Sequence, residues 1–125
     1  MILRAALLLL LTGLLAGCVS SGSTDPLRTD EGRQQARDAY IQLGIGYLQQ
    51  GAAARAKTPL RKALEIDPNS ADAHAALALV FQTEMENDLA DKHYREALSS
   101  RKDARILNNY GSFLFCLLYT SPSPR

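Results

Sequence analysis

Tryptophan is absent from this chain, and aromatic residues make up only 6% of its 125 residues. So few large rings argue against a thick β-sandwich core. Neither sign of charge is in excess, since 14 basic and 13 acidic side chains leave a net charge of +1. Nucleic-acid binding needs a basic excess that displaces counterions, so we expect no nucleic-acid partner. Two cysteines cannot form a disulfide scaffold, and the length allows one small domain.

The chain also lacks the motifs of common catalytic and cofactor sites. No G-x-S-x-G motif or phosphate loop occurs, and the glycines of residues 44–46 are not followed by a third. His74 and His93 are the two histidines, and neither belongs to an HExxH or CxxC arrangement. We therefore predict a protein that is not an enzyme, with no catalytic residue, no metal site, no cofactor and no small-molecule substrate.

The N-terminal segment has the pattern of an export signal. Arg4 precedes an apolar run over residues 5–15, which is interrupted by Thr12 and Gly13. Eleven helical residues at roughly 1.5 Å each cannot cross a hydrocarbon layer of roughly 30 Å. This run is typical of a secretory h-region, and a buried core helix is the alternative. We predict a lipoprotein signal peptide over residues 1–17.

The apolar run ends in Leu15-Ala16-Gly17-Cys18, which resembles the bacterial lipobox. The resemblance implies cleavage before Cys18, whose sulfur carries a diacylglycerol and whose new N-terminus carries an acyl chain; these chains would anchor the protein to a membrane. Val19 rather than Asp follows the cysteine. By the same resemblance, this favours the periplasmic side of the outer membrane. The alternative is an ordinary secreted cysteine.

Small polar residues follow the cysteine. Residues 20–26 read Ser-Ser-Gly-Ser-Thr-Asp-Pro, a composition typical of a flexible linker. We predict that residues 18–32 form a lipidated tether that carries no chemistry.

The rest of the chain repeats itself. Residues 40–44 align with residues 74–78 at an offset of 34, and this period resembles the tetratricopeptide repeat. The resemblance implies an all-α solenoid of antiparallel helix pairs, about two and a half repeats over residues 33–115. We expect helices at 33–50, 53–66, 71–84, 88–100 and 104–117. The small residues that let paired helices approach are Gly44, Ala56, Ala63, Ala78, Ala90 and Ala97, and the large residues between them are Leu43, Tyr47, Leu60, Leu77, Phe81 and Tyr94.

Some positions depart from a regular repeat. Pro59 falls inside the second helix, so we expect a kink or a restart with Thr58 as cap. Residues 69–72 have capping-box spacing for the next helix. Residues 109–111 lie 33 rather than 34 positions after their counterparts, which loosens the junction to the third unit.

The third unit lacks a second helix. Residues 116–125 resemble the translation of a transposon-type sequencing adaptor, so we predict a non-native tail there; a real apolar patch with a disordered Ser-Pro end is the alternative. A solenoid needs about three repeats and polar caps. We therefore expect marginal stability and self-association, because the unfinished unit leaves uncovered Tyr110, Phe113, Leu114 and Leu117.

A binding surface is more plausible than a catalytic one. In tetratricopeptide stacks the first helix of each unit lines a concave groove, and on this phasing that face also includes Asp38, Asp72 and Ala76. Apolar side chains facing water in such a groove suit a peptide or an amphipathic helix. Part of this face could instead pack on the tether or a neighbouring unit. The predicted protein-binding groove consists of Ile41, Gln42, Ile45, Leu48, Gln49, Ala75, Leu79 and Gln82.

Three segments resemble one particular family of tetratricopeptide-repeat proteins. Residues 37–44, 59–68 and 81–86 resemble the type IV pilus biogenesis/stability lipoproteins, the PilF/PilW pilotin family, and the likeness covers residues 18–115. It implies a truncated, non-enzymatic adaptor that binds the secretin subunit and promotes its outer-membrane localisation and multimerisation. A general tetratricopeptide scaffold for envelope complexes and a fragment of an envelope hydrolase are the alternatives.

Overall fold

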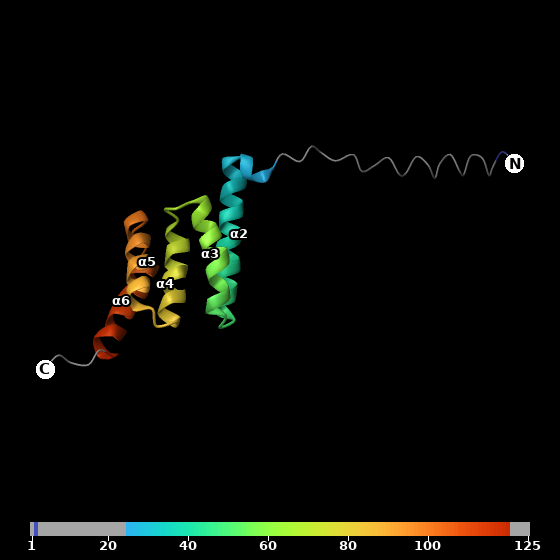
Figure 1. Ribbon diagram of the computed structural model, residues 1–125. Coiled ribbons are helices and arrows are strands. Elements are labelled where there is room, and N and C mark those ends of the chain that lie inside the picture. Colours follow the sequence, from blue (N-terminus) through green and yellow to red (C-terminus); the bar gives the residue numbers. More distant parts are fainter. Residues whose placement is uncertain (1, 3–24, 121–125) are drawn as a thin grey trace.

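The computed structural model describes residue 2 and residues 25–120 (Figure 1). Its elements are a short 3-10 helix, η1 (Pro26–Arg28), and five α-helices: α2 (Asp30–Gln49), α3 (Ala53–Ile66), α4 (Ala71–Thr83), α5 (Asn87–Ser100) and α6 (Ala104–Thr120). No strand occurs among these residues. Apart from residue 2, the predicted signal peptide lies outside the described residues, as do Cys18 and the Ser-Pro end.

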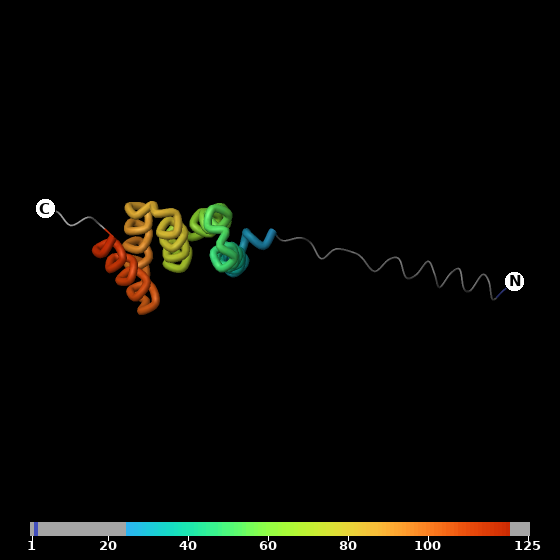
Figure 2. The backbone as a smooth tube through the Cα atoms, turned by 90° about the horizontal axis from the view of Figure 1, so that it is seen from below, coloured from blue at the N-terminus to red at the C-terminus, as the bar shows by residue number. Residues whose placement is uncertain are grey.

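The helices form consecutive antiparallel pairs. α2 packs on α3 and α4 on α5, while α3 contacts α4 and α5 contacts α6. Figure 2 views the helices from their ends and shows them following one another in chain order. The predicted all-α stack of two and a half helix pairs is confirmed. No helix in the described part of the chain combines the length and apolarity needed to cross a membrane.

Small residues let the paired helices approach, as the sequence predicts. Ala56, Ala63, Ala78, Ala90 and Ala97 have no exposed surface. The large side chains among them are also buried, with Leu60 and Tyr94 at 0% exposure, Leu77 at 1% and Phe81 at 6%.

Leu43 is an exception to the predicted core. It is 49% exposed, although its counterpart 34 positions later, Leu77, is 1% exposed. α4 is covered by α3 of the preceding pair, whereas among the described residues only the short η1 precedes α2, with no helix pair before it. The corresponding face of α2 is therefore open.

The first helix begins earlier than predicted. α2 starts at Asp30 instead of residue 33, because the Thr29 hydroxyl caps it by accepting a hydrogen bond of 3.0 Å from the Gly32 N–H. η1 packs against this first turn. A methyl group at position 32 would overlap the Pro26 carbonyl, so only glycine fits there. The expected tether over residues 18–32 thus overlaps an ordered segment.

Other helix ends also differ from the predictions. Ser70 rather than Asn69 caps α4, since its hydroxyl accepts a bond of 3.4 Å from the Ala73 N–H. α3 runs without a break through Pro59, so it does not restart at Thr58. α6 continues to Thr120 instead of ending at residue 117.

The turns inside the two complete pairs share one hydrogen-bonding pattern. In the first turn, the Ala52 N–H bonds to the Tyr47 carbonyl at 2.9 Å, and Gly51 has a φ of 73°. Met85, 34 positions after Gly51, has a φ of 62°, although a side chain disfavours this left-handed conformation. The matching bond, also 2.9 Å, joins the Glu86 N–H to the Phe81 carbonyl.

α6 is held to α5 by aromatic contacts and one short hydrogen bond. The Phe113 ring centroid lies 5.6 Å from that of Tyr94, and Phe113 is only 1% exposed. The Tyr110 hydroxyl donates to the Asp91 carboxylate at 2.6 Å, which helps hold the pKa of Asp91 below its ordinary value. The prediction that Phe113 would be uncovered is therefore wrong. Leu114, from the same predicted set, is 43% exposed.

Candidate protein-binding groove

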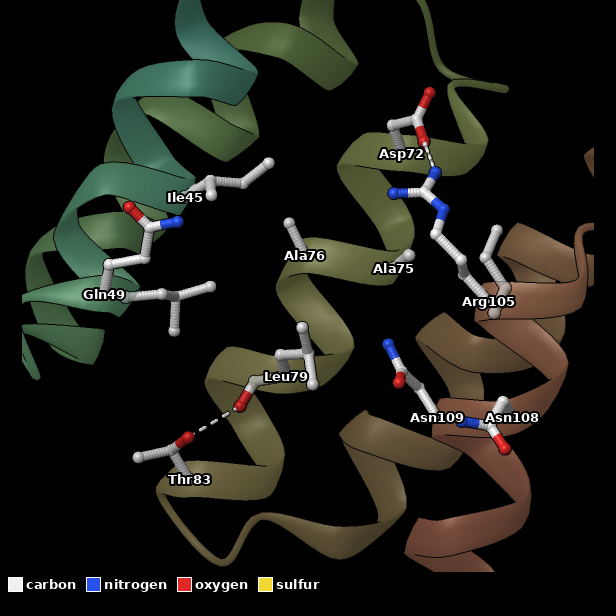
Figure 3. Close-up of a pocket in the computed structure, with 12 residues that line it drawn as sticks. Ile45, Gln49, Asp72, Ala75, Ala76, Leu79, Thr83, Arg105, Asn108 and Asn109 are labelled. Atoms are coloured by element: carbon white, nitrogen blue, oxygen red, sulfur yellow. Dashed lines mark hydrogen bonds and ion pairs between the residues drawn. The ribbon is translucent and has the colours of Figure 1, made fainter.

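A groove of about 600 Å³ opens between α2, α4 and α6, the first helices of the three units (Figure 3). Equivalent helices of successive pairs face the same side of the stack, so their side chains converge on one surface. The lining residues are Ile45, Leu48 and Gln49 from α2, Asp72, Ala75, Ala76, Leu79 and Thr83 from α4, and Arg105, Ile106, Asn108 and Asn109 from α6.

The floor of the groove is formed by one stripe of α4. Asp72, Ala75, Ala76, Leu79 and Thr83 recur at helical spacing, which places them on one face of the helix. The two alanines at the centre leave room because their side chains end at Cβ. A long side chain from a partner could therefore reach the α4 backbone surface.

The wall formed by α2 is mostly apolar, whereas the wall formed by α6 exposes mainly polar side chains. Ile45 and Leu48 form the α2 wall, and both are half-buried because they pack against the buried hydrophobic side chains between the helices. Ile106 of α6, which is 2% exposed, lies on the other side. Apolar area removed from water contributes about 25 cal/mol per Å², so an apolar segment seated here would gain binding energy mainly from the α2 wall.

A charged network lies around Asp72 at one end of the groove. The Asp72 carboxylate accepts two hydrogen bonds from Arg101, at 2.6 and 3.1 Å, and one from Arg105 at 3.5 Å. Asp103 also pairs with both arginines, and the Arg105 backbone N–H is the main cause of its lowered pKa. These bonds connect α4 to the loop between α5 and α6 and, through Arg105, to the first turn of α6.

Amide and hydroxyl groups line other parts of the groove. The Thr83 hydroxyl donates to the Leu79 carbonyl at 2.8 Å. Figure 3 shows the Asn109 side chain between α4 and α6, with Asn108 beside it on α6. Such amides can both donate and accept hydrogen bonds, so they could pair with the backbone of a bound polypeptide.

The structure brings five of the eight predicted groove residues together: Ile45, Leu48, Gln49, Ala75 and Leu79. Ile41 was placed wrongly on this water-facing surface. It is 5% exposed and packs in a small cluster with Ala63 and Ala73, because α3 and α4 both cover that turn of α2.

Three further residues of the predicted face lie outside the groove lining. Gln82 accepts a hydrogen bond of 2.8 Å from the Tyr94 hydroxyl, so it joins α4 to α5. Gln42 is exposed on α2. Asp38 is exposed too and pairs with Arg37 at 2.8 Å.

Sequence reasoning missed Thr83 and the α6 wall: Arg105, Ile106, Asn108 and Asn109. The signal for the wall was available in the shift to a 33-residue offset. Applied to the floor, that offset relates Asp72 to Arg105, Ala75 to Asn108 and Ala76 to Asn109. The groove prediction therefore stopped one helix too early.

The predicted lipidation site cannot be compared with the structure, since Leu15, Ala16, Gly17 and Cys18 lie outside the described residues. Within residues 25–120, no three His, Cys, Asp or Glu side chains gather as metal ligands would. The groove as described holds apolar surface, amides and an internally paired charge network, a combination suited to binding a polypeptide segment.

Two known proteins resemble the chain in sequence, although no family model matches it. The chain is 67% identical over 116 residues to the type IV pilus assembly protein PilF of Pseudomonas aeruginosa, a match that covers 92% of this chain and 46% of that protein. It is 32% identical over 102 residues to an uncharacterized protein of Haemophilus influenzae, covering 81% of this chain and 54% of the relative. The chain thus spans about half the length of the curated relatives it matches.

A solved structure shows the same fold. The structure described under the functional characterization of Pseudomonas aeruginosa pilF superposes with a TM-score of 0.69 at 68% sequence identity. The match covers 70% of this chain and 40% of that one.

Proposed function

We propose that this chain acts in type IV pilus biogenesis as a non-enzymatic adaptor, and that its α2–α4–α6 groove binds a segment of the secretin subunit. The 67% identity to a type IV pilus assembly protein supports the pathway. The observation that carries the binding role is the groove itself, with its alanine floor, its apolar α2 wall and the amides of its α6 wall. The secretin as partner comes from the resemblance of residues 37–44, 59–68 and 81–86 to the pilotin lipoproteins.

The proposed mechanism is recruitment. Lipidation at Cys18 would confine the helix pairs to the periplasmic side of the outer membrane. Confinement of both partners to one surface raises their effective concentration, so a groove of moderate affinity would suffice to gather secretin subunits for multimerisation. The chain need not perform any covalent chemistry in this mechanism.

The binding role can be tested in a piliated host that lacks its own copy of the gene. Cells carrying Ala75→Arg, which fills the centre of the groove floor, should contain few secretin multimers in the outer membrane. Ala54→Arg is the matched control, because Ala54 is exposed on α3 and does not line the groove. Equal amounts of multimer with the two variants would reject the groove as the binding site.

The membrane anchor is a separate part of the proposal. Cys18→Ser should abolish incorporation of a labelled fatty acid and release the protein from the outer-membrane fraction, because no thiol remains to carry the diacylglycerol. Labelling that persists in this variant would contradict the anchor, but it would leave the groove proposal untouched.

A further inference from the structure

The two histidines meet between α4 and α5, and neither lines the groove. Nδ1 of His74 lies 2.9 Å from Nδ1 of His93, and Nε2 of His74 lies 2.9 Å from the Pro68 carbonyl oxygen. His74 is 9% exposed, and its ring is therefore almost entirely enclosed. The pair connects the first helix of the second unit, its partner helix and the loop that precedes both.

These contacts determine where the protons are. A carbonyl oxygen only accepts hydrogen bonds, so Nε2 of His74 must be the donor to Pro68. In the neutral ring, Nδ1 of His74 then has a lone pair, and His93 must donate its Nδ1–H across the 2.9 Å contact. This contact holds one hydrogen, so it cannot persist when both rings are protonated.

The surroundings of His93 disfavour a positive charge. The Phe81 ring stacks on His93, with centroids 5.3 Å apart and planes inclined by 13°. Burial is the main cause that lowers the pKa of His93 to about 4, and the charges of His74, Lys92 and Arg61 lower it further. Glu96 of α5 is the acidic group that opposes them.

One more cation comes from α3. The Lys57 ammonium lies 5.5 Å from the centroid of the Phe81 ring, and it is paired at 2.5 Å with Glu84, the residue that follows α4. The charged groups that act on His93 are thus Arg61 from α3 and Lys92 and Glu96 from α5, while the Lys57–Glu84 pair lies against the Phe81 ring.

We propose that His74 and His93 form an acid-sensitive latch between α4 and α5, closed while both imidazoles are neutral and released when they take up protons. The released state would place positive charge in the interface, near the α3 cation Arg61, and remove the bond that holds the rings together. Because α4 also supplies the floor of the groove, release would loosen that floor.

The direction of the pH effect follows from the lowered pKa of His93. In the unfolded chain His93 binds a proton near pH 6.5, whereas in the folded chain it binds one only near pH 4. The contribution of neutral His93 to folding stability is therefore fully present above pH 6.5 and is lost as the pH falls toward 4. Between pH 7.5 and 5.0, His93 alone should raise the unfolding equilibrium constant by about 30-fold.

Urea denaturation of the full chain and its His93→Gln variant at both pH values tests the latch. Wild type should show the rise of about 30-fold, while the variant, whose side-chain amide can still donate to His74, should change only a few-fold. The same pH dependence in both proteins would overturn the proposal.

A second measurement covers the case in which the variant does not fold. Imidazole proton shifts of the wild-type chain, followed by NMR from pH 8 to pH 4, should show His93 remaining neutral at pH 5.5. Titration of His93 near pH 6.5 would overturn the latch. This experiment needs no partner, so its result is independent of the proposed role in pilus biogenesis.

Discussion

A methyl group placed on Gly44 would lie 2.5 Å from Cγ of Leu60, which is closer than two non-bonded carbon atoms approach in proteins. Leu60 has no exposed surface and cannot move aside. α2 and α3 therefore approach each other at a point where only glycine fits. Gly46 lies two positions along the same helix, and a methyl group placed there would meet no atom within 4 Å, so this glycine provides an internal comparison.

Gly44→Ala should destabilise the chain by about 1–2 kcal/mol, because overpacking outweighs the gain in helix propensity. Gly46→Ala should stabilise it by roughly 0.5–1 kcal/mol, since that site gains propensity without a clash. Urea denaturation of the two variants measures both values. A stabilising Gly44→Ala would show that α2 and α3 are not packed as closely as described.

The strained turn between α4 and α5 gives a second prediction. Met85 has a φ of 62° and is 76% exposed, so its side chain gains little from packing to offset the left-handed conformation. Met85→Gly should raise stability by roughly 0.5–1 kcal/mol. At the matching turn, Gly51→Ala should lower stability by about 1 kcal/mol. Thermal denaturation of both variants measures these changes in stability. A destabilising Met85→Gly would mean that the Met85 side chain supports the fold.

The apolar side of α6 underlies a third prediction. Leu107, Phe115, Leu118 and Tyr119 are each more than half exposed, and monomeric proteins rarely leave so large an apolar patch open. We expect concentration-dependent self-association that Phe115→Glu suppresses. Leu43→Glu, which alters an exposed leucine at the opposite end of the stack, should leave association unchanged. Sedimentation velocity distinguishes these cases, and a wild-type monomer at high concentration would contradict the expectation.

The helix pairs could be predicted because their packing repeats along the chain. Gly44, Ala78 and the residues aligned with them recur at a fixed period, so residue size alone indicates which positions are enclosed. The early start of α2 was missed because Thr29, its cap, follows a segment whose composition is typical of a linker.

The groove was predictable in part, for a physical reason that Ile41 and Ile45 illustrate. They lie one turn apart on the same face of α2, but α3 and α4 cover Ile41 and leave Ile45 open to the groove. Helix periodicity identifies a face; it does not say how far a neighbouring helix extends over it. The contact of His74 with His93 likewise could not be predicted from local sequence patterns, because the two residues are 19 positions apart and meet only where α4 pairs with α5.

Binding of the purified secretin subunit tests the central claim most directly. Isothermal titration calorimetry with the wild-type chain should give measurable affinity, which Ala75→Arg should weaken at least tenfold, on the order of 1.4 kcal/mol. Ala54→Arg should bind as wild type does, because its side chain lies outside the groove. Equal affinities for all three proteins, or no binding by the wild-type chain, would contradict the account.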